Sequence, residues 1–438
     1  MVQIFKASSK KTQVKQNLTV TVQRLDQHGC GVAVQGKKAV FIDGALPGET
    51  VQVQVYEQKS KFLKAKLQQV ITESEARVAV KCRHFYHCGG CNLQHLAYQQ
   101  QLTYKQDKVS QLFAREGINI ALPWQSHITS QPWQYRRKAR IGVQYNKQGN
   151  AIIGFRRRAS NDLTTITSCP VLDAAFADIF TELTALLPKL SGKNAIGHVE
   201  VIAANANVVV VRQLLNASPQ DKQHWQDFAK KNNYLVYLDD GKQLTALSDD
   251  QPLHYRVTDT LTIEFSVNDF IQINHKVNQQ MVAQAQAWLA LKPQDRVLDL
   301  FSGLGNFSLP IAQQVQAVVG IEGVPAMVAK AQNNAKRNGI DNCQFYQADL
   351  NSDWHAQPWV TVKYTKALLD PARAGAYQAI RQLLLLNIKS ILYVSCDPAT
   401  LARDAKLLLS HGYKVEKIAL IDMFSQTKHV ETMVMFSL

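Results

Sequence analysis

The chain has 438 residues, which is long for one ordinary domain and suggests about three. Its 49 Lys and Arg against 34 Asp and Glu give a formal charge of +15, which favours a polyanionic partner such as nucleic acid, although a basic surface without specific meaning has the same composition. No stretch approaches the roughly 18 consecutive apolar residues of a membrane span, and the first residues lack the apolar core of a secretory signal. We therefore expect a cytoplasmic protein with no membrane partner.

Residues 17–70 contain short runs that alternate apolar and polar residues, such as 17–22 and 50–56, with glycines between them. This pattern predicts a small antiparallel β-barrel of the OB-like kind. Barrels of this kind often bind oligonucleotides. Near the end of the region lie four lysines that would suit phosphate or simply face solvent: Lys59, Lys61, Lys64 and Lys66.

Four of the seven cysteines are grouped in a way that indicates a metal rather than disulfides. Cys82, Cys88 and Cys91 share one glycine-containing loop, and Cys169 follows later in the chain. Four thiolates fit either an iron–sulfur cluster or zinc, and cysteines that bind nothing are the third reading. His84 and His87 could replace a ligand in a zinc site, but with four cysteines available we interpret both as neighbours of the site.

The next two regions are a predicted helix and a stretch rich in basic and aromatic residues. Residues 93–117 have apolar residues at helical spacing and predict a helix. Residues 133–158 contain no Asp or Glu, and aromatic residues are interleaved with eight basic ones: Arg136, Arg137, Lys138, Arg140, Lys147, Arg156, Arg157 and Arg158. Arginines contact phosphate and aromatic rings stack on unpaired bases, so this stretch predicts an RNA-binding surface, with a solvated basic hairpin as the alternative.

Further strands precede a region with the pattern of a doubly wound α/β sheet. Strands are expected within 199–212, 234–238 and 261–265, and a helix runs to about 291. From there strands and helices alternate to the end. The buried strand 296–300 opens into a loop with Gly303 and Gly305, where the backbone can approach a ligand, although two glycines alone are weak evidence.

Acidic residues stand at the ends of successive strands in this region. Glu322 could accept both hydroxyls of a ribose, Asp349 could hold an adenine amino group, and Asp370 ends the next strand. Each could be an ordinary turn residue when taken singly. Their recurrence at one edge of the predicted sheet favours a nucleotide-like cofactor, either NAD or S-adenosylmethionine.

Cys396 ends a short apolar strand and is followed at once by Asp397 and Pro398, which predict the N-cap and first residue of a helix. The partial positive charge of a helix N-terminus favours the thiolate, as a nucleophile requires, whereas a small buried hydrophobe is the alternative. The chain ends in two predicted adjacent strands, 414–421 and 431–436, typical of S-adenosylmethionine methyltransferases. Glu431 lies beside their connection, where it could also be a plain edge-strand acid.

Four short motifs lie in the second half of the chain. Residues 299–307 read DLFSGLGNF, residues 370–375 read DPARAG, residues 395–398 read SCDP and residues 429–431 read HVE. Together they resemble the RNA uracil-5-methyltransferase family, over essentially the whole chain and in the same order. The N-terminal region resembles the family's TRAM domain, and the four cysteines resemble its four-iron four-sulfur site. That combination is typical of members that act on 23S ribosomal RNA.

The resemblance implies roles for particular residues. Cys396 would be the nucleophile that attacks C6 of uracil, and Glu431 the base that removes the C5 proton. Asp370 would hold the uracil edge beside the cofactor. The residues implied for S-adenosylmethionine are Gln272, Phe301, Asn306, Glu322, Asp349 and Asp370, and those for a structural [4Fe-4S] cluster are Cys82, Cys88, Cys91 and Cys169. Ser302, Ala372 and Asp397 depart from the usual pattern, and Asp397 would oppose ionisation of the thiol.

The implied architecture has three parts: a TRAM barrel over 10–72, a central α+β RNA-binding iron–sulfur domain over 73–92 and 125–268, and a Rossmann-like methyltransferase domain over 93–124 and 269–438. The implied function is C5-methylation of one uridine in 23S rRNA, with a uridine of transfer RNA or another 23S site as the alternative, and no obligate protein partner. An NAD oxidoreductase would not use Cys396 with Glu431, a cytosine methyltransferase typically has Pro-Cys, and a purely RNA-binding protein would leave these acids idle.

Overall fold

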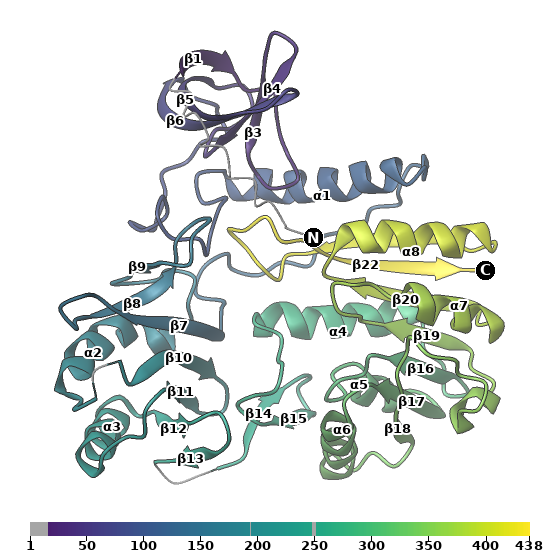
Figure 1. Cartoon of the computed structure of the whole chain (residues 1–438). Coiled ribbons are helices and arrows are strands. Elements are labelled where there is room, and N and C mark those ends of the chain that lie inside the picture. Colours follow the sequence, from purple (N-terminus) through teal and green to yellow (C-terminus); the bar gives the residue numbers. More distant parts are fainter. Residues whose placement is uncertain (1–15, 193, 248–250) are drawn as a thin grey trace, which may run out of the picture. The chain divides into compact units, whose positions relative to one another are not determined.

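The computed structural model describes residues 16–192, 194–247 and 251–438. Two compact units divide the chain: the first comprises residues up to Lys81 with Cys91–Tyr104 and Gln426–Lys428, and the second comprises Cys82–Gly90, Lys105–Ser425 and His429–Leu438. Figure 1 shows the elements of both units, coloured by their position in the sequence. The predicted barrel domain begins with residues 10–15, which lie outside the described residues.

The first unit is built on a six-stranded sheet of order β1-β5-β6-β4-β3-β2. Its strands are β1 (Gln16–Thr21), β2 (Arg24–Leu25), β3 (Gly31–Gln35), β4 (Lys38–Asp43), β5 (Thr50–Gln58) and β6 (Phe62–Thr72). The strand pairs are antiparallel, as predicted, except that β4 and β6 pair in parallel. The outer strands β1 and β2 are not hydrogen-bonded to each other within the described ranges, so closure into a barrel is not confirmed.

Alternation along β5 explains why this segment is a strand. Val51, Val53 and Val55 are fully buried in a core with Val40 and Ile42. The residues between the valines face outward, which is the period of two that the sequence contains. The unit's apolar face is therefore fixed by local sequence.

Helix α1 (Tyr98–Arg115) is shorter than the predicted helix over 93–117. Its apolar residues do continue backwards to Leu93 and Leu96, but these pack in a small cluster with Leu46. The backbone N–H of Leu93 donates to the carbonyl oxygen of Gln426 at 3.0 Å, and so does that of Asn92. A tertiary hydrogen bond thus takes the place of the first helical turn.

The second unit contains a seven-stranded mixed sheet of order β13-β12-β11-β10-β7-β8-β9. The strands are β7 (Lys138–Tyr145), β8 (Ala151–Arg156), β9 (Leu163–Thr165), β10 (Ile196–Ala203), β11 (Asn207–Gln213), β12 (Leu235–Asp239) and β13 (Leu244–Ala246). Helices η1 (Ala174–Phe176), α2 (Ile179–Leu186), η2 (Leu187–Lys189) and α3 (Pro219–Asn232) share its apolar core. The predicted strand region 199–212 is a hairpin of β10 and β11.

A second seven-stranded sheet in this unit has the order β18-β17-β16-β19-β20-β22-β21. Its strands are β16 (Arg296–Leu300), β17 (Ala317–Glu322), β18 (Cys343–Gln347), β19 (Lys366–Leu369), β20 (Ser390–Ser395), β21 (Lys414–Ile421) and β22 (Glu431–Ser437). The first five run parallel, and β22 is antiparallel to both of its neighbours, which confirms the predicted terminal hairpin. A separate hairpin joins β14 (Leu253–Arg256) to β15 (Thr262–Phe265).

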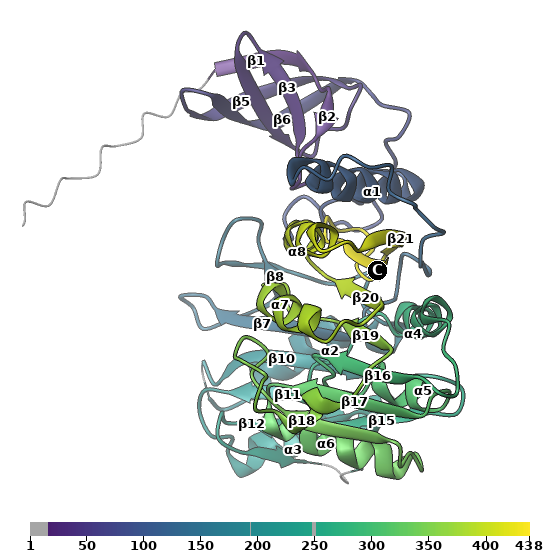
Figure 2. The ribbon, with the colours of Figure 1, turned by 90° about the vertical axis from the view of Figure 1, so that its right-hand side faces the viewer.

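Helices cover both faces of this sheet, as expected for a doubly wound fold (Figure 2). Helices α4 (His275–Leu289), α5 (Ser308–Ala312) and α6 (Pro325–Arg337) share one core with Val297, Leu368 and Leu392 of the strands. Helices α7 (Tyr377–Leu385) and α8 (Pro398–Ser410) pack against each other, and η3 (Pro358–Thr361) precedes β19. Because the strands are buried on both faces, they read as continuous apolar runs.

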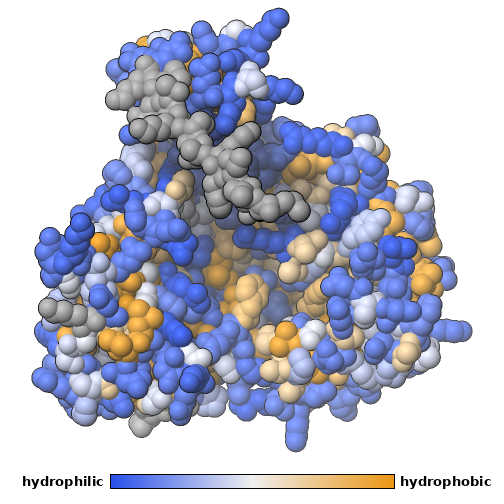
Figure 3. Space-filling model, in the orientation of Figure 1, coloured by the Kyte–Doolittle hydropathy of each residue, from blue (hydrophilic) through white to orange (hydrophobic). Residues whose placement is uncertain are grey.

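Hydrophilic side chains dominate the face of the molecule in Figure 3, with hydrophobic ones scattered among them. The large exposed hydrophobic residues include Phe270, which is 71% exposed, and Leu214. None of the helices in the described ranges combines the length and apolarity needed to cross a lipid bilayer.

Candidate active site

Strand β20 places Cys396 directly before helix α8. Asp397 is the N-cap, as predicted: one of its carboxylate oxygens accepts hydrogen bonds from the N–H groups of Ala399 at 2.9 Å and Thr400 at 3.3 Å. Pro398 occupies the first turn, where its missing N–H costs nothing. The thiol is half-buried at the carboxyl end of a strand buried on both faces.

The helix terminus is not the largest influence on the pKa of this thiol. Burial raises the pKa of Cys396 to about 11, and the negative charges of Glu431 and Asp370 raise it further. The guanidinium of Arg373 lowers this pKa, as does a backbone hydrogen bond. The charges that oppose thiolate formation are therefore those of the two acids across the site, while the Asp397 carboxylate is engaged with the helix amides.

Strand pairing brings Glu431 opposite Cys396. In the antiparallel register of β20 and β22, Ser395 faces Thr432, so the next residue of β20's chain faces the first residue of β22. Glu431 is only 7% exposed, and its Oε2 has no hydrogen-bond partner among the described side chains and backbone. Burial raises its pKa to about 8, with a further contribution from Asp370.

Asp370 follows β19, the strand beside β20. Burial raises its pKa to about 7. The charges of Asp370, Cys396 and Glu431 act on one another, so the structure brings these three predicted residues to the same edge of the sheet. A thiol flanked by two carboxyl groups that hold protons near neutral pH can combine nucleophilic attack with proton transfer.

A sharp turn follows β16 beside this edge. Phe301, Gly303 and Gly305 all have positive φ, of 66°, 55° and 92°, and the N–H groups of Phe301 and Ser302 both donate to the carbonyl oxygen of Ile321. A Cβ atom placed on Gly303 would meet nothing within 4 Å, so the backbone there faces open space. Such a turn lets a ligand approach the main chain closely.

The backbone orients the carboxylate of Glu322 at the end of β17. Gly303 N–H donates to its Oε2 at 3.1 Å, and Val324 N–H donates to its Oε1 at 3.0 Å. Asp349 is exposed just beyond β18, whose Gln347 pairs with Glu322. Both acids thus lie at the carboxyl edge of neighbouring strands, where open α/β sheets bind ligands.

The other two residues predicted for the cofactor differ in their contacts. The side-chain amides of Asn306 and Asn278 bond to each other at 2.9 Å in both directions, and Tyr255 also donates to Asn306. Asn306 is therefore largely committed to neighbouring side chains. The carbonyl oxygen of Gln272 accepts from Arg137 Nε at 2.6 Å, and its side chain is partly exposed.

Part of the predicted RNA-binding stretch is internal, which corrects the interpretation of those residues. Arg137 is 3% exposed, and its guanidinium lies 4.4 Å from the ring centre of Tyr255. Lys138 donates to the carbonyl oxygens of Val267 and Asp269. Arg158 donates to the carbonyl oxygens of Phe85 and Cys88. The members of the basic stretch that remain exposed are Arg140, Lys147, Arg156 and Arg157.

The four predicted ligand cysteines divide between the units. Cys82, Cys88 and Cys169 belong to the second unit and Cys91 to the first. Gly90 N–H donates to the sulfur of Cys88 at 3.3 Å, and backbone hydrogen bonds from residues 171 and 172 lower the pKa of Cys169 against the larger effect of burial. Within the described ranges, no three His, Cys, Asp or Glu side chains are grouped so as to hold a metal ion.

His84 has a role that its sequence context does not reveal. Its Nε2 lies 3.1 Å from Thr167 Oγ1 and accepts the Thr167 N–H at 3.2 Å. These bonds join the Cys82 loop to the segment just before Cys169. That His84 is a neighbour of the cysteines and not a ligand stays a prediction.

Three residues near the site were not identified from the sequence. Asp299 of β16 is 1% exposed, accepts a hydrogen bond from Ser308, and burial raises its pKa to about 7. The positive charge of Arg373 lowers the pKa of the Cys396 thiol. Arg373 lies in a loop whose sequence suggests only a turn. Lys105 is 1% exposed. It lies four residues from the buried Gln101 and four from the buried Val109, and this helical spacing is the sequence pattern that could have identified it as buried.

Replacing Arg373 with glutamine is expected to make Cys396 less reactive, because the cation that favours the thiolate is lost. Since Arg373 is exposed and solvent screens its charge, we expect about a two- to fivefold slower reaction of this thiol near pH 8. The rate can be measured with iodoacetamide and peptide mass spectrometry. Arg381→Gln, an exposed arginine on α7, is the matched control, and an equal loss in both variants would contradict the assignment.

Comparisons with known proteins give the family. The model of the tRNA (Uracil-5-)-methyltransferase family matches residues 97–357 and 359–438, and that of the TRAM domain matches 11–67. The chain is 52% identical to a 23S rRNA (uracil(1939)-C(5))-methyltransferase RlmD of Colwellia psychrerythraea, over 100% of this chain and 99% of that protein. It is 43% identical to the protein of the same name from Aliivibrio fischeri, with both chains covered completely.

A solved structure shares the fold. The tRNA (uracil-54, C5)-methyltransferase of Pyrococcus abyssi, solved in complex with S-adenosyl-L-homocysteine, superposes with a TM-score of 0.74 over 95% of this chain and 99% of its own, at 22% sequence identity. At that identity the likeness concerns the fold alone, whereas the family match and the full-length relatives concern the protein. The chain belongs to the tRNA (Uracil-5-)-methyltransferase family and is an RNA uracil-C5 methyltransferase with an N-terminal TRAM domain.

Proposed function

We propose that this protein uses S-adenosylmethionine to methylate C5 of the uridine at position 1939 of 23S rRNA. Full-length relatives at 52% and 43% identity are named for that reaction, which supports the choice of substrate. The observation that carries the chemistry is the convergence of Cys396, Glu431 and Asp370 at one sheet edge beside the glycine turn. A uridine of transfer RNA, or another site of 23S rRNA, is the alternative substrate.

Cys396 begins the reaction in this proposal. Carbon 5 of uracil is too weak a nucleophile to take a methyl group unaided. Attack of the Cys396 thiolate on C6 forms an S–C bond and moves the electrons of the C5=C6 double bond into an enolate, which makes C5 nucleophilic. Bound S-adenosylmethionine supplies the methyl group. Asp370, which burial holds partly protonated near pH 7, can donate a hydrogen bond to the uracil edge.

Glu431 completes the reaction in this proposal. After methylation C5 still carries its proton. The acceptor we assign is Oε2 of Glu431, which has no hydrogen-bond partner within the described part of the chain. As the proton leaves, the C6–S bond breaks, the double bond re-forms, and the thiolate is released. Because burial raises the pKa of Glu431 to about 8, the ionised base becomes more abundant as the pH rises from 7 to 9. Release of product should accelerate over that range.

The glycine turn and the strand ends would hold the cofactor. Glu322, fixed by two backbone N–H groups, suits the ribose hydroxyls, and the exposed Asp349 suits an adenine amino group. Phe301 and Gln272 would line the same site. Asn306 would act by holding its position through Asn278, since most of its amide is already bonded.

For RNA we assign the exposed members of the basic stretch, Arg140, Lys147, Arg156 and Arg157, together with the TRAM domain. Arg137, Lys138 and Arg158 are left out because they bond to the protein interior. The target uridine must leave its stack or lie in a loop to reach the thiol. We keep the three-domain division, the cytoplasmic location and the absence of an obligate protein partner as part of the proposal.

A structural [4Fe-4S] cluster held by Cys82, Cys88, Cys91 and Cys169 is also proposed. It is supported by the number and spacing of the thiols and by the N–H groups that bond to the sulfurs of Cys88 and Cys169, which favour thiolate ligands. Protein purified without oxygen should contain about four iron and four acid-labile sulfide per chain. Zinc without iron would overturn the cluster.

The function is tested by mapping 5-methyluridine in total RNA from cells with and without the gene for this protein. We expect the modification at position 1939 of 23S rRNA to disappear on deletion and to return when the gene is restored. Loss at a transfer RNA position, or at another 23S site, would establish the alternative instead. An unchanged RNA modification pattern would refute the proposed function.

A further inference from the structure

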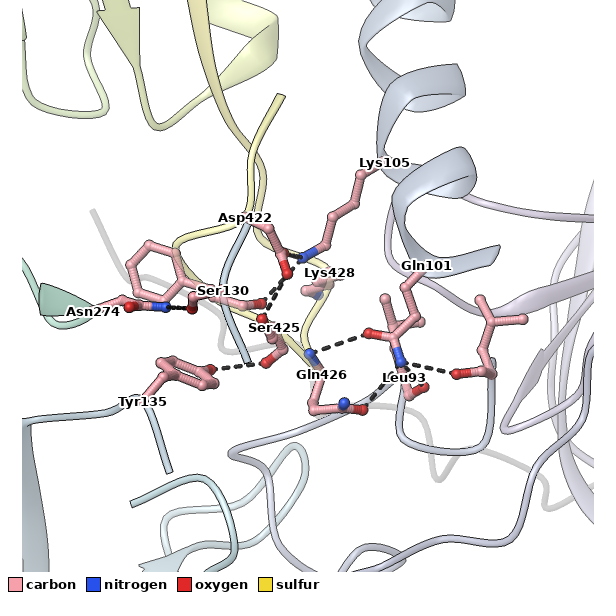
Figure 4. Close-up of polar contacts among 12 residues, drawn as sticks. Leu93, Gln101, Lys105, Ser130, Tyr135, Asn274, Asp422, Ser425, Gln426 and Lys428 are labelled. Atoms are coloured by element: carbon pink, nitrogen blue, oxygen red, sulfur yellow. Dashed lines mark hydrogen bonds and ion pairs between the residues drawn. The ribbon is translucent and has the colours of Figure 1, made fainter. Parts of the chain in front are cut away.

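A buried ion pair lies close to the proposed base. Lys105 Nζ of α1 is 2.6 Å from Asp422 Oδ1 in the ion pair drawn in Figure 4. Both residues are 1% exposed. Lys105 Nζ also donates to the carbonyl oxygen of Phe424 at 3.1 Å. These residues are 317 positions apart in the chain, so the pair is a purely tertiary feature.

The ion pair belongs to a network that fixes the segment between β21 and β22. Ser425 Oγ donates to Asp422 Oδ2 at 2.5 Å, and Tyr135 donates from its hydroxyl to the carbonyl oxygen of Ser425 at 2.8 Å (Figure 4). The N–H of Asp422 donates to the carbonyl oxygen of Ile128 at 2.8 Å. Both carboxylate oxygens of Asp422 are thus occupied, and the chain that leads to Glu431 is held from two other elements.

This network lies next to Glu431 in the sheet. Ile421 is the direct cross-strand partner of Glu431, and Asp422 is the residue that follows it. Glu431 is also subject to the charge of Asp370, from the loop after β19, and faces Cys396 from the end of β20. Among these groups Lys105 supplies the positive charge that favours ionised Glu431, whereas Asp370 and Asp422 oppose it.

Burying such a pair is difficult to explain by stability alone. Desolvation of two charges offsets most of their attraction, and apolar residues of similar size often stabilise a core equally well. A cation near the buried Glu431 has a clear use. Without Lys105, the negative charges of Asp370 and Asp422 would favour the protonated form of this base unopposed. We therefore expect the Lys105–Asp422 pair to contribute to the reaction.

We propose that Lys105, through its ion pair with Asp422, is a positioning residue that holds Glu431 in place as the ionised base for removal of the C5 proton. The proposal rests on the proposed role of Glu431. In this proposal Lys105 contacts neither the thiol nor the target base. Its loss should therefore leave adduct formation by Cys396 intact and slow only the resolution of the adduct.

The experiment is a single-turnover assay of the full-length protein with S-adenosylmethionine and a 23S rRNA fragment that contains the target uridine. Adduct formation and adduct resolution are followed separately by denaturing gel between pH 6.5 and 9.5. For Lys105→Met we expect resolution about tenfold slower at pH 7, with its pH midpoint about one unit higher, and formation within about twofold of wild type. Removal of a cation favours the protonated acid, which sets this direction.

Two further variants separate the charge effect from misfolding. Lys105→Met with Asp422→Asn removes both charges and leaves no unpaired ion, so its midpoint should return toward wild type. Arg115→Met removes an exposed cation from the same helix and should change neither step. Thermal unfolding of each variant is measured alongside.

Particular results would overturn the inference. A Lys105→Met protein that folds and resolves the adduct with an unshifted midpoint would exclude the electrostatic role, and so would equal slowing of both steps. If the wild type forms no adduct at all, the proposed covalent mechanism fails first, and the positioning role fails with it. That outcome is distinguishable because it does not depend on Lys105.

Discussion

Replacing Cys396 with alanine is expected to abolish both methyl transfer and the covalent protein–RNA adduct. The uracil ring then has no group to add at C6, so its C5 stays too weak a nucleophile; we expect a loss on the order of 10⁴-fold or more in turnover. The measurement uses RNA that carries 5-fluorouridine at the target position. Its C5 has no removable proton, so wild-type protein with S-adenosylmethionine should remain attached to it in a denaturing gel.

The matched control is Cys30→Ala, which removes a thiol of intermediate exposure from the first unit. It should keep full activity and form the adduct. Adduct formation by Cys396→Ala would exclude this residue as the nucleophile. Failure of the wild type to form any adduct would instead reject the covalent mechanism.

Replacing Glu431 with glutamine is expected to separate the two halves of the reaction. The thiol remains, and removal of the nearby negative charge should lower its pKa from about 11, so addition to C6 proceeds at least as fast as in wild type. Release of the product lacks its base and should slow by on the order of 10²- to 10⁴-fold. A methylated covalent adduct with ordinary RNA should therefore accumulate, and it can be quantified by denaturing gel and mass spectrometry.

Glu416→Gln serves as the control, since Glu416 is an exposed acid on the neighbouring strand β21. Its turnover should match wild type. If Glu431→Gln also turned over at the wild-type rate, the base would have to be reassigned while Cys396 kept its role. If it formed no adduct, Glu431 would be needed before the addition step, which contradicts the order of events proposed here.

The pH dependence of the wild type follows from the same two groups. Thiolate formation increases as the pH rises toward the pKa of Cys396, about 11, and the base ionises as the pH passes about 8. Both effects have the same sign, so methylation should rise with pH from 6.5 to 9. Burial raises the pKa values of Asp299, Asp370 and Glu431, so the fold is more stable when these acids are protonated. As the pH rises from about 4 to about 8, we therefore expect folding stability to fall while activity increases.

Local sequence determined much of the fold. The alternation in 50–56, the apolar run before Cys396 with its cap at Asp397, and the strand and glycine turn at 296–305 depend on neighbours in the chain, and the structure contains each of them. The terminal hairpin also followed from its pattern. Periodicity, caps and turns act over a few residues, which is why sequence reveals them.

What only the tertiary structure decided concerns partners and burial. The insertion of β22 between β20 and β21 sets Glu431 opposite Cys396, and the fold carries Lys105 to Asp422. Burial, and not the helix terminus, dominates the pKa of Cys396, and it turned Arg137 from a presumed RNA contact into a core residue. Pairing between distant segments and the loss of water around a charge are properties of the packed chain, so no local pattern encodes them.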